Sequence, residues 1–188
     1  MGRLPAVLAR YREHCPAVKL HCETGKWTDL VNAVLAHRLD GAFIAERSDH
    51  PDIAHREVCQ ESLVLIASPE HGDISCPQDL QRMPVLMWPQ GCPYRRALEH
   101  WLMQAGVSAE ITDIASYASI LGCVSSGGGV SLVPASVFER FQNIGNMNSY
   151  RFAELSPVPG WFISHRQSVP HRARDAFISL LEAEARAG

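Results

Sequence analysis

The chain has 188 residues, of which 46% are hydrophobic and 20% are charged, and its formal net charge is −3. This composition is typical of a folded globular protein and excludes a disordered or fibrous chain. The longest apolar stretches, such as residues 63–67 and 130–133, are far shorter than the ~20 residues that span a bilayer. Lysines and arginines are scattered rather than gathered in one stripe, which argues against direct binding of nucleic acid. We therefore expect no membrane partner and no direct DNA contact.

Cysteines and histidines are numerous but do not form a recognisable site. The six cysteines are widely spaced without a C-x-x-C pair, which favours reduced thiols in the core of a cytoplasmic protein. The nine histidines give neither H-E-x-x-H nor a cluster at zinc spacing. No signal peptide opens the chain. We expect no metal, no cofactor and a cytoplasmic location.

The first 45 residues alternate between helical and strand patterns. Leu4, Val7, Leu8 and Tyr11 recur at helical spacing, and Pro16 ends that pattern. In residues 17–23 apolar and polar side chains alternate with a period of two, which predicts a strand. A second helix is predicted over residues 27–38, followed by a buried parallel strand in the apolar run 41–45.

The rest of the chain continues in the same way after a polar connection at residues 48–55. A strand at 62–67 runs into a break at 68–72, and a fresh series of alternating elements begins there. The predicted elements are a short helix near 77–81, a strand at 84–88, a helix at 93–105, a strand at 109–114, a helix at 116–126, a strand at 130–133, a helix at 136–141, strands at 150–155 and 161–165, and a terminal amphipathic helix carrying Ala173, Phe177, Leu180 and Leu181.

This order predicts an α/β fold with two doubly wound, Rossmann-like lobes joined by two crossover strands, as in type 2 periplasmic binding proteins. Residues 1–67 and 135–188 would form lobe I, and residues 68–134 would form lobe II. The expected binding site is the cleft between the lobes, because ligands of open α/β sheets bind beyond the carboxyl ends of the strands.

The expected ligand contacts come from three turns. The first contains Thr24, Gly25 and Trp27. The second contains Trp88, Gly91, Cys92, Tyr94 and Arg95, where a strand leads into a helix whose free N–H groups would attract an anion. The third begins with Ser116. An alternative for the second turn is that Trp88 belongs to the core and Arg95 pairs with Glu99 at i, i+4.

No pattern indicates catalysis. Residues 125–129 lack the spacing of a phosphate-binding loop, and a helix end that allows close packing is the preferred interpretation. Ser125 and Ser126 precede the glycines at a helix end, whereas a hydrolase serine lies between glycines after a strand. We therefore assign no catalytic residue and do not expect an enzyme.

Several segments, in order along the chain, resemble the effector-binding domain of LysR-type transcriptional regulators. They are Leu4-Pro5, Pro16-Ala17-Val18, Thr24-Gly25, the run from Leu39 to Phe43, the run from Glu61 to Ile66 with His71, the run from Gly91 to Arg96, and the run from Ser125 to Pro134. Two departures are a histidine, His37, where the family commonly has glycine, and a start inside the first helix rather than at a preceding strand.

The resemblance implies that a small, anionic metabolite binds between the lobes and changes how an absent N-terminal winged helix-turn-helix domain binds DNA. It also implies that Gly127 and Gly128 border the cleft. In the family such domains pair side by side as homodimers, and tetramers form when the protein is full length. The alternatives are a solute receptor of a transporter, which needs an export signal, and a small-molecule enzyme on the same fold.

Overall fold

The computed structural model describes residues 2–155, 157–167 and 169–187. Contacts divide the chain into two units. The terminal unit comprises Arg3–Gln60 and Pro159–Gly188, and the middle unit comprises Glu61–Val158 together with Gly2. This division differs from the predicted lobe boundaries, which lie after residues 67 and 134. The two strands expected to cross between the lobes at those points, residues 62–67 and 130–133, instead pair with each other within the middle unit.

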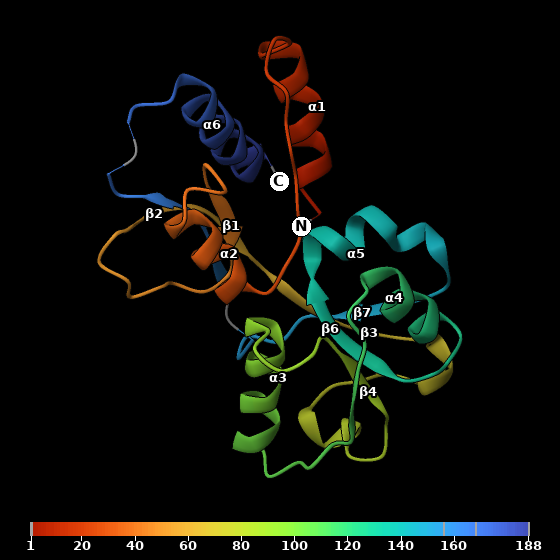
Figure 1. Cartoon of the computed structure of the whole chain (residues 1–188). Coiled ribbons are helices and arrows are strands. Elements are labelled where there is room, and N and C mark those ends of the chain that lie inside the picture. The colour runs from red at the N-terminus through yellow and green to blue at the C-terminus, as the bar shows by residue number, and fades with distance from the viewer. Residues whose placement is uncertain (1, 156, 168, 188) are drawn as a thin grey trace. The chain divides into compact units, whose positions relative to one another are not determined.

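Helices and strands alternate strictly between residues 85 and 141, as the sequence pattern predicts there, whereas two helices and then three strands follow one another in the first 67 residues (Figure 1). Short 3₁₀ turns, labelled η, punctuate the connections. The elements are α1 (Leu4–His14), α2 (Trp27–Leu35), β1 (Ala42–Ile44), β2 (Ile53–Glu61), β3 (Leu63–Ala67), η1 (Pro69–His71), η2 (Pro77–Leu80), β4 (Val85–Met87), α3 (Pro93–Gln104), β5 (Ile111–Asp113), α4 (Tyr117–Ser125), β6 (Val130–Pro134), α5 (Ala135–Phe141), η3 (Gln142–Ile144), β7 (Asn148–Tyr150), β8 (Val158–His165) and α6 (Arg172–Ala187).

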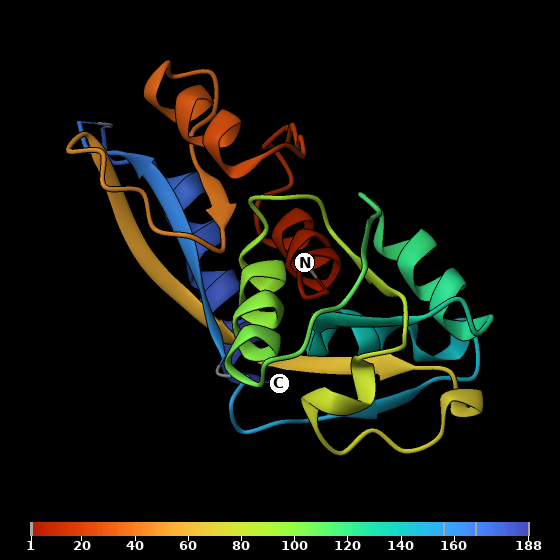
Figure 2. The same ribbon diagram turned by 90° about the horizontal axis from the view of Figure 1, so that it is seen from below.

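The sheet of the terminal unit has the order β1-β8-β2, so the last strand of the chain lies between the first two. The long strands β2 and β8 run side by side in Figure 2. β1 pairs with β8 in antiparallel fashion, with Ala42 opposite Ile163 and Ile44 opposite Trp161. The prediction of a parallel strand at residues 41–45 is therefore wrong in direction, because its partner comes from the far end of the chain.

Three strand predictions need correction. Residues 17–23 are exposed and belong to no sheet, because alternation alone does not supply a hydrogen-bonding partner. β2 was missed, since only Ile53, Val58 and Glu61 of its nine residues are buried and its other side chains read as a polar connection. The strand expected at residues 150–155 instead covers Asn148–Tyr150.

The terminal unit buries two apolar groups of side chains. In the first, α1 packs on α6: Val7 and Tyr11 are buried, and the Tyr11 ring meets Phe177 edge-on with centroids 5.4 Å apart. The Tyr11 hydroxyl also donates a hydrogen bond to the Ala173 carbonyl oxygen at 3.0 Å. In the second group, α2 packs its buried Val31 and Val34 beside β1. The apolar faces of α1 and α2 that the sequence predicts are thus buried within the terminal unit.

The sheet of the middle unit has the order β5-β4-β6-β3-β7. β4 pairs in parallel with β5 and β6, whereas β3 pairs antiparallel with β6 and β7. β3 and β6 are fully buried along their lengths. A mixed sheet of this kind is common in α/β proteins. The described residues thus form an α/β fold with mixed sheets.

Helices α4 and α5 lie together beside β3 and β6 (Figure 1), and they share one buried apolar cluster with these strands. Ile120, Leu121 and Val124 of α4 are completely buried in it. The entry to β6 is tight: Gly129 has φ +143°, and a Cβ atom there would lie 2.3 Å from the Pro84 carbonyl oxygen. Glycine is therefore required where β6 begins to pair beside β4.

The described residues contain neither a candidate membrane span nor a candidate metal cluster. None of the helices in that part of the chain combines the length and the apolar character needed to cross a membrane. No group of three or more histidine, cysteine, aspartate or glutamate side chains among the same residues could hold a metal ion.

Candidate functional site

The turn between β4 and α3 brings together the second group of predicted site residues. Trp88 follows β4, Gly91 adopts φ +92° within the turn, and Cys92 is the N-cap of α3. Pro93 occupies the first helical position, where its missing N–H costs nothing. The turn therefore lies at the carboxyl end of a parallel strand and at the start of a 12-residue helix, as predicted.

Arg95 is held inside this turn by protein groups. Only 7% of the residue is exposed. Its Nε donates to Glu99 Oε1 at 2.7 Å, and one terminal nitrogen donates to the Trp88 carbonyl oxygen at 3.1 Å and to the Asp113 carboxylate. Burial alone lowers the pKa of Arg95, but the two carboxylates outweigh it and raise that pKa.

These contacts within the chain compete with the predicted role of Arg95, which is to bind an anionic effector. Its charge is already matched by Glu99 and Asp113, which are partly exposed and bonded to it directly. The i, i+4 pair with Glu99 was one of the two readings that the sequence allowed. Asp113 was not foreseen, because it lies 18 residues further along the chain.

Cys92 lies at the start of α3, where the sequence analysis placed backbone N–H donors for an anion. Burial raises the pKa of the Cys92 thiol, and hydrogen bonds from the backbone N–H groups of Arg95 and Tyr94 partly oppose that rise. A raised pKa keeps the thiol protonated and weakly nucleophilic near neutral pH. The Cys92 thiol at the start of α3 is therefore uncharged near neutral pH.

Aromatic side chains gather around this turn. The rings of Trp88 and Tyr117 meet edge-to-face with centroids 5.2 Å apart. Burial raises the pKa of Tyr117 strongly, and Tyr94, Cys92 and Glu61 add to the rise. The indole Nε1 of Trp88 is buried and has no hydrogen-bond partner among the described residues. We call Trp88, Cys92, Tyr94 and Tyr117 the aromatic turn cluster.

Ser116 lies at the N-terminus of α4, directly before Tyr117. Its Oγ accepts a hydrogen bond from the Ser119 backbone N–H at 3.3 Å, which makes it the N-cap of the helix. Tyr117 was not among the predicted site residues, although its position after a capping serine at a helix start is visible in the sequence. Ser116 therefore lies next to Tyr117, a member of the aromatic turn cluster, at the start of α4.

Gly127 and Gly128 do not join this cluster. They end α4: Gly127 has φ +77°, and the Gly128 N–H donates to the Cys123 carbonyl oxygen at 2.9 Å. The nine residues of α4 separate them from Ser116 by the length of the helix, about 14 Å at about 1.5 Å per residue. The glycines therefore have the helix-capping role that the sequence favoured over phosphate binding.

The first predicted group, Thr24, Gly25 and Trp27, belongs to the terminal unit. Thr24 and Gly25 are exposed in the segment before α2, and Trp27 is the first residue of that helix. Trp27 is half-buried and packs against the apolar cluster that contains Val31 and Val34. A Cβ atom at Gly25 would meet only the Leu30 side chain at ordinary contact distance. No backbone constraint therefore explains the glycine.

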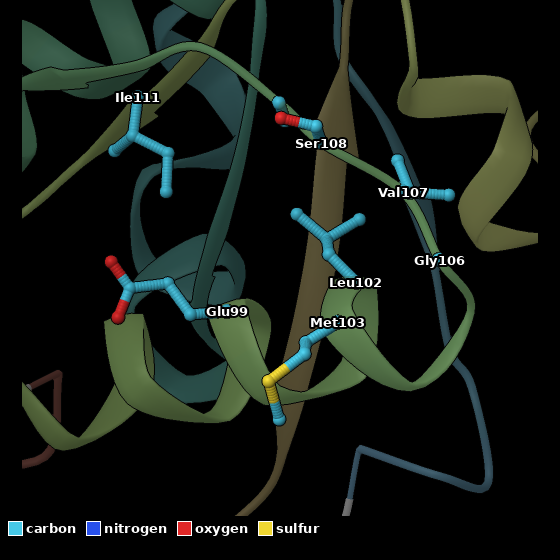
Figure 3. A pocket seen from close by; sticks show the side chains of 8 residues that line it. Glu99, Leu102, Met103, Gly106, Val107, Ser108 and Ile111 are labelled. Atoms are coloured by element: carbon cyan, nitrogen blue, oxygen red, sulfur yellow. The ribbon is translucent and has the colours of Figure 1, made fainter.

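A pocket of about 380 Å³ lies elsewhere in the middle unit, on the second half of α3 and the connection that follows it (Figure 3). The Leu102 and Glu99 side chains point from the helix toward this connection, and Met103, which is 65% exposed, lies at its edge. The pocket contains none of the predicted site residues. Its lining consists of Glu99, Leu102, Met103, Gly106, Val107, Ser108, Ala109 and Ile111.

Comparison with known proteins gives a consistent result. The model of the family described as "LysR substrate binding domain" matches residues 1–186. The HTH-type transcriptional regulator GltR of Bacillus subtilis (strain 168) is 34% identical over 178 residues, which cover 94% of this chain and 60% of GltR. The HTH-type transcriptional regulator SoxR of Arthrobacter sp. (strain TE1826) is 32% identical, covering 97% of this chain and 63% of SoxR. The chain thus spans about three fifths of these curated relatives.

Solved structures with a similar fold include regulatory domains. The regulatory domain of MetR, a LysR family regulator from N. meningitidis, has a TM-score of 0.77 at 16% identity and covers 99% of this chain and 88% of that one. The effector-binding domain of QuiR in complex with shikimate has a TM-score of 0.78 at 14% identity, covering 98% and 90%. The cofactor-binding domain of the Cbl transcriptional regulator has a TM-score of 0.84 at 21% identity, covering 96% and 82%.

Proposed function

Because this chain belongs to the LysR substrate-binding domain family, we propose that it senses a small-molecule effector for a transcriptional regulator. The observation that carries the proposal is the family match over residues 1–186. The relatives GltR and SoxR are HTH-type transcriptional regulators, and the fold is that of regulatory domains such as the shikimate-bound domain of QuiR. Effector binding would change how a winged helix-turn-helix domain of the longer protein binds DNA. No bond is made or broken in this function.

We place one part of the effector site at the aromatic turn cluster and Ser116. The cluster lies at the carboxyl end of β4 and at the starts of α3 and α4, where α/β sheets bind ligands. The buried Trp88 Nε1 could donate a hydrogen bond to an effector oxygen. The assignment of Thr24, Gly25 and Trp27 to the same effector stays a prediction from the sequence.

The contacts of Arg95 bear on the charge of the effector. Arg95, the expected partner of an anion, already pairs with Glu99 and Asp113. An anionic effector would need a cation other than Arg95 at this turn. We therefore propose a small metabolite bound by aromatic faces and neutral donors on this side of the site.

The test is calorimetric titration of the purified regulator with a panel of cellular carboxylates, amino acids and amines. Thr24→Val and Ser116→Ala variants should weaken the binding of any hit at least tenfold. Ser116 also caps α4, and its loss lowers stability by about 1 kcal/mol. Binding is therefore measured directly rather than by melting temperature, with Ser119→Ala as the control. A metabolite that binds both variants as tightly as the parent would contradict the placement of the site. Mass spectrometry of the metabolite after incubation with the protein checks that it is not converted.

We also propose that the chain forms a homodimer in the cytoplasm. In the segment 17–23 Val18 and Leu20 are 38% and 39% exposed, and the backbone of the segment belongs to no sheet. Exposed apolar side chains on backbone that pairs with no strand favour association with another chain. Sedimentation at tens of micromolar should show a dimer, and Leu20→Lys should shift it toward monomer. A wild-type monomer would contradict this proposal.

A further inference from the structure

The pocket on the second half of α3 and the connection to β5 contains no member of the aromatic turn cluster among its described lining residues (Figure 3). Its volume of about 380 Å³ falls at the lower end of the range for small-molecule pockets, which is roughly 300–1,000 Å³. An occupant of this pocket would therefore be a second ligand, separate from the effector proposed above.

The inner wall of this pocket is apolar. Leu102 of α3 and Val107 of the connection line it and are buried, and Ile111 of β5 is half-buried beside them. Met103 stands at the edge and is largely exposed. Its unbranched thioether side chain can adapt to ligands of different shape. The pocket thus offers a surface against which the apolar body of a small ligand can be buried.

Glu99 gives the pocket its charge. Its side chain points from α3 toward the connection (Figure 3) and is partly exposed. Oε1 accepts the hydrogen bond from Arg95 Nε at 2.7 Å, which leaves Oε2 as the acceptor for a ligand. Arg95 also pairs with Asp113, so two carboxylates share one guanidinium. One negative charge of this group is therefore not matched within it.

The end of α3 adds to the negative potential. The carbonyl groups of the last helical turn form the negative end of the helix dipole. The Val107 N–H donates to the Leu102 carbonyl oxygen at 2.9 Å, and Gly106 takes the left-handed position of this Schellman motif at φ +67°. The connection is thereby held against the helix end. Neither the last turn of α3 nor the lining of the pocket, all within the described chain, contains a basic residue.

We propose that this pocket binds a small organic cation with an aliphatic body, of the class of primary alkylamines. The ammonium group would bind Glu99 Oε2 near the end of α3, and the alkyl chain would lie against Leu102 and Val107. A carboxylate of the same length would meet like charge at both Glu99 and the helix end. A neutral alcohol of the same length would gain only the apolar contact. The charge of the ligand therefore distinguishes this site from a merely apolar surface.

The experiment compares hexylamine, hexanol and hexanoate, which share one alkyl chain and differ in charge. Hexylamine is protonated near neutral pH, like the lysine side chain. Titration of hexylamine into the chain, followed by NMR, should shift the amide signals of Val107 and Ser108. The dissociation constant should lie in the millimolar range, because so small a ligand makes few contacts. Hexanol should bind at least threefold more weakly than hexylamine, and hexanoate at least tenfold more weakly.

Two variants test the carboxylate. Glu99→Gln keeps an acceptor for Arg95 but removes the charge, so it should weaken hexylamine binding at least threefold and leave hexanol binding unchanged. Met103→Lys places an ammonium group at i, i+4 from Glu99, where it would pair with that carboxylate and should weaken hexylamine binding to a similar extent. Gln104→Lys is the matched control, because Gln104 is exposed on the same helical turn and lies outside the described pocket lining. It should bind hexylamine as the parent does.

Circular dichroism checks that the variants are folded. The proposal would be overturned if hexylamine left the Val107 and Ser108 signals unshifted, or if hexanoate bound as tightly as hexylamine. Undiminished hexylamine binding by Glu99→Gln and Met103→Lys would overturn it as well. None of these measurements uses an effector, so their outcome is independent of the effector titration proposed above.

Discussion

The guanidinium of Arg95 at the start of α3 donates a hydrogen bond to the carboxylate of Asp113 at the end of β5. This bond ties a helix start to a neighbouring strand of the same sheet. Arg95→Met should destabilise the middle unit by about 2 kcal/mol, because the Trp88 carbonyl and two carboxylates lose their donor. The loss is smaller than for a fully buried pair, since Asp113 is half-exposed.

Urea unfolding of Arg95→Met, Asp113→Asn and the double variant measures this coupling. The double variant should be less destabilised than the sum of the single variants, because each single change leaves a partner unpaired. Strict additivity would show that the bond contributes nothing to stability.

A second prediction concerns the pH dependence of stability. Burial lowers the pKa of His55, and the charges of Arg47 and Arg166 lower it further. His55 Nε2 also accepts a hydrogen bond from the Ser48 backbone N–H at 3.2 Å, which requires an unprotonated nitrogen. The unfolded chain therefore binds the proton more readily than the folded chain. Stability from this group is complete above the unfolded pKa of 6.5 and is lost as the pH falls through the folded pKa.

Chemical unfolding between pH 8 and pH 5 checks this expectation. His55→Gln keeps an acceptor for Ser48 but has no charge to gain, so its stability should fall less over this range. An equal fall in both proteins would show that other groups cause the pH dependence.

A third prediction follows from the left-handed backbone of His37. A side chain at φ +54° costs roughly 1–2 kcal/mol, and most of it is relieved by glycine. His37→Gly should therefore raise the free energy of unfolding by about 1 kcal/mol, after allowance for the greater entropy of the unfolded chain. His37→Val should lower it, because a β-branched residue tolerates positive φ poorly. Thermal unfolding of both variants would reveal the opposite signs.

A fourth prediction contrasts two glycines of the middle unit. Gly129→Ala should destabilise by about 2–4 kcal/mol, because the new Cβ would lie 2.3 Å from the Pro84 carbonyl oxygen in a left-handed backbone. Gly122, inside α4, has open space around it. Gly122→Ala should stabilise by about 0.5–1 kcal/mol through helix propensity. Equal effects in a denaturant series would contradict the described entry to β6.

The helices of the fold were predictable because their apolar stripes are local. The pattern of Leu4, Val7, Leu8 and Tyr11 fixes α1 without reference to any other segment. Strand partners are not local: nothing near Ala42 announces Ile163, its neighbour in the sheet. The alternation in residues 17–23 is as regular as that of a strand, yet it meets no partner. Periodicity thus indicates which side chains lie together, but not which backbone completes the hydrogen bonds.

The candidate site was predictable to a similar extent. The turn from Trp88 to Arg95 could be found, because a strand that leads through glycine and proline into a helix is a local pattern. The partner Asp113 and the neighbour Tyr117 could not be found, since they come from other elements that the sheet brings near. The sequence therefore left two roles open for Arg95, an effector contact or a pair with Glu99, and could not show its second carboxylate partner.

The order β1-β8-β2 has a consequence for how the chain emerges from the ribosome. β1 and β2 are synthesised early, but the strand that lies between them follows only after residues 62–157. All strands of the middle unit's sheet are synthesised before β8. The middle unit can therefore finish folding during translation, while β1 and β2 wait with unsatisfied backbone groups. Nascent chains that stall before β8 would expose those strand edges, which makes this interval the period of greatest risk for aggregation.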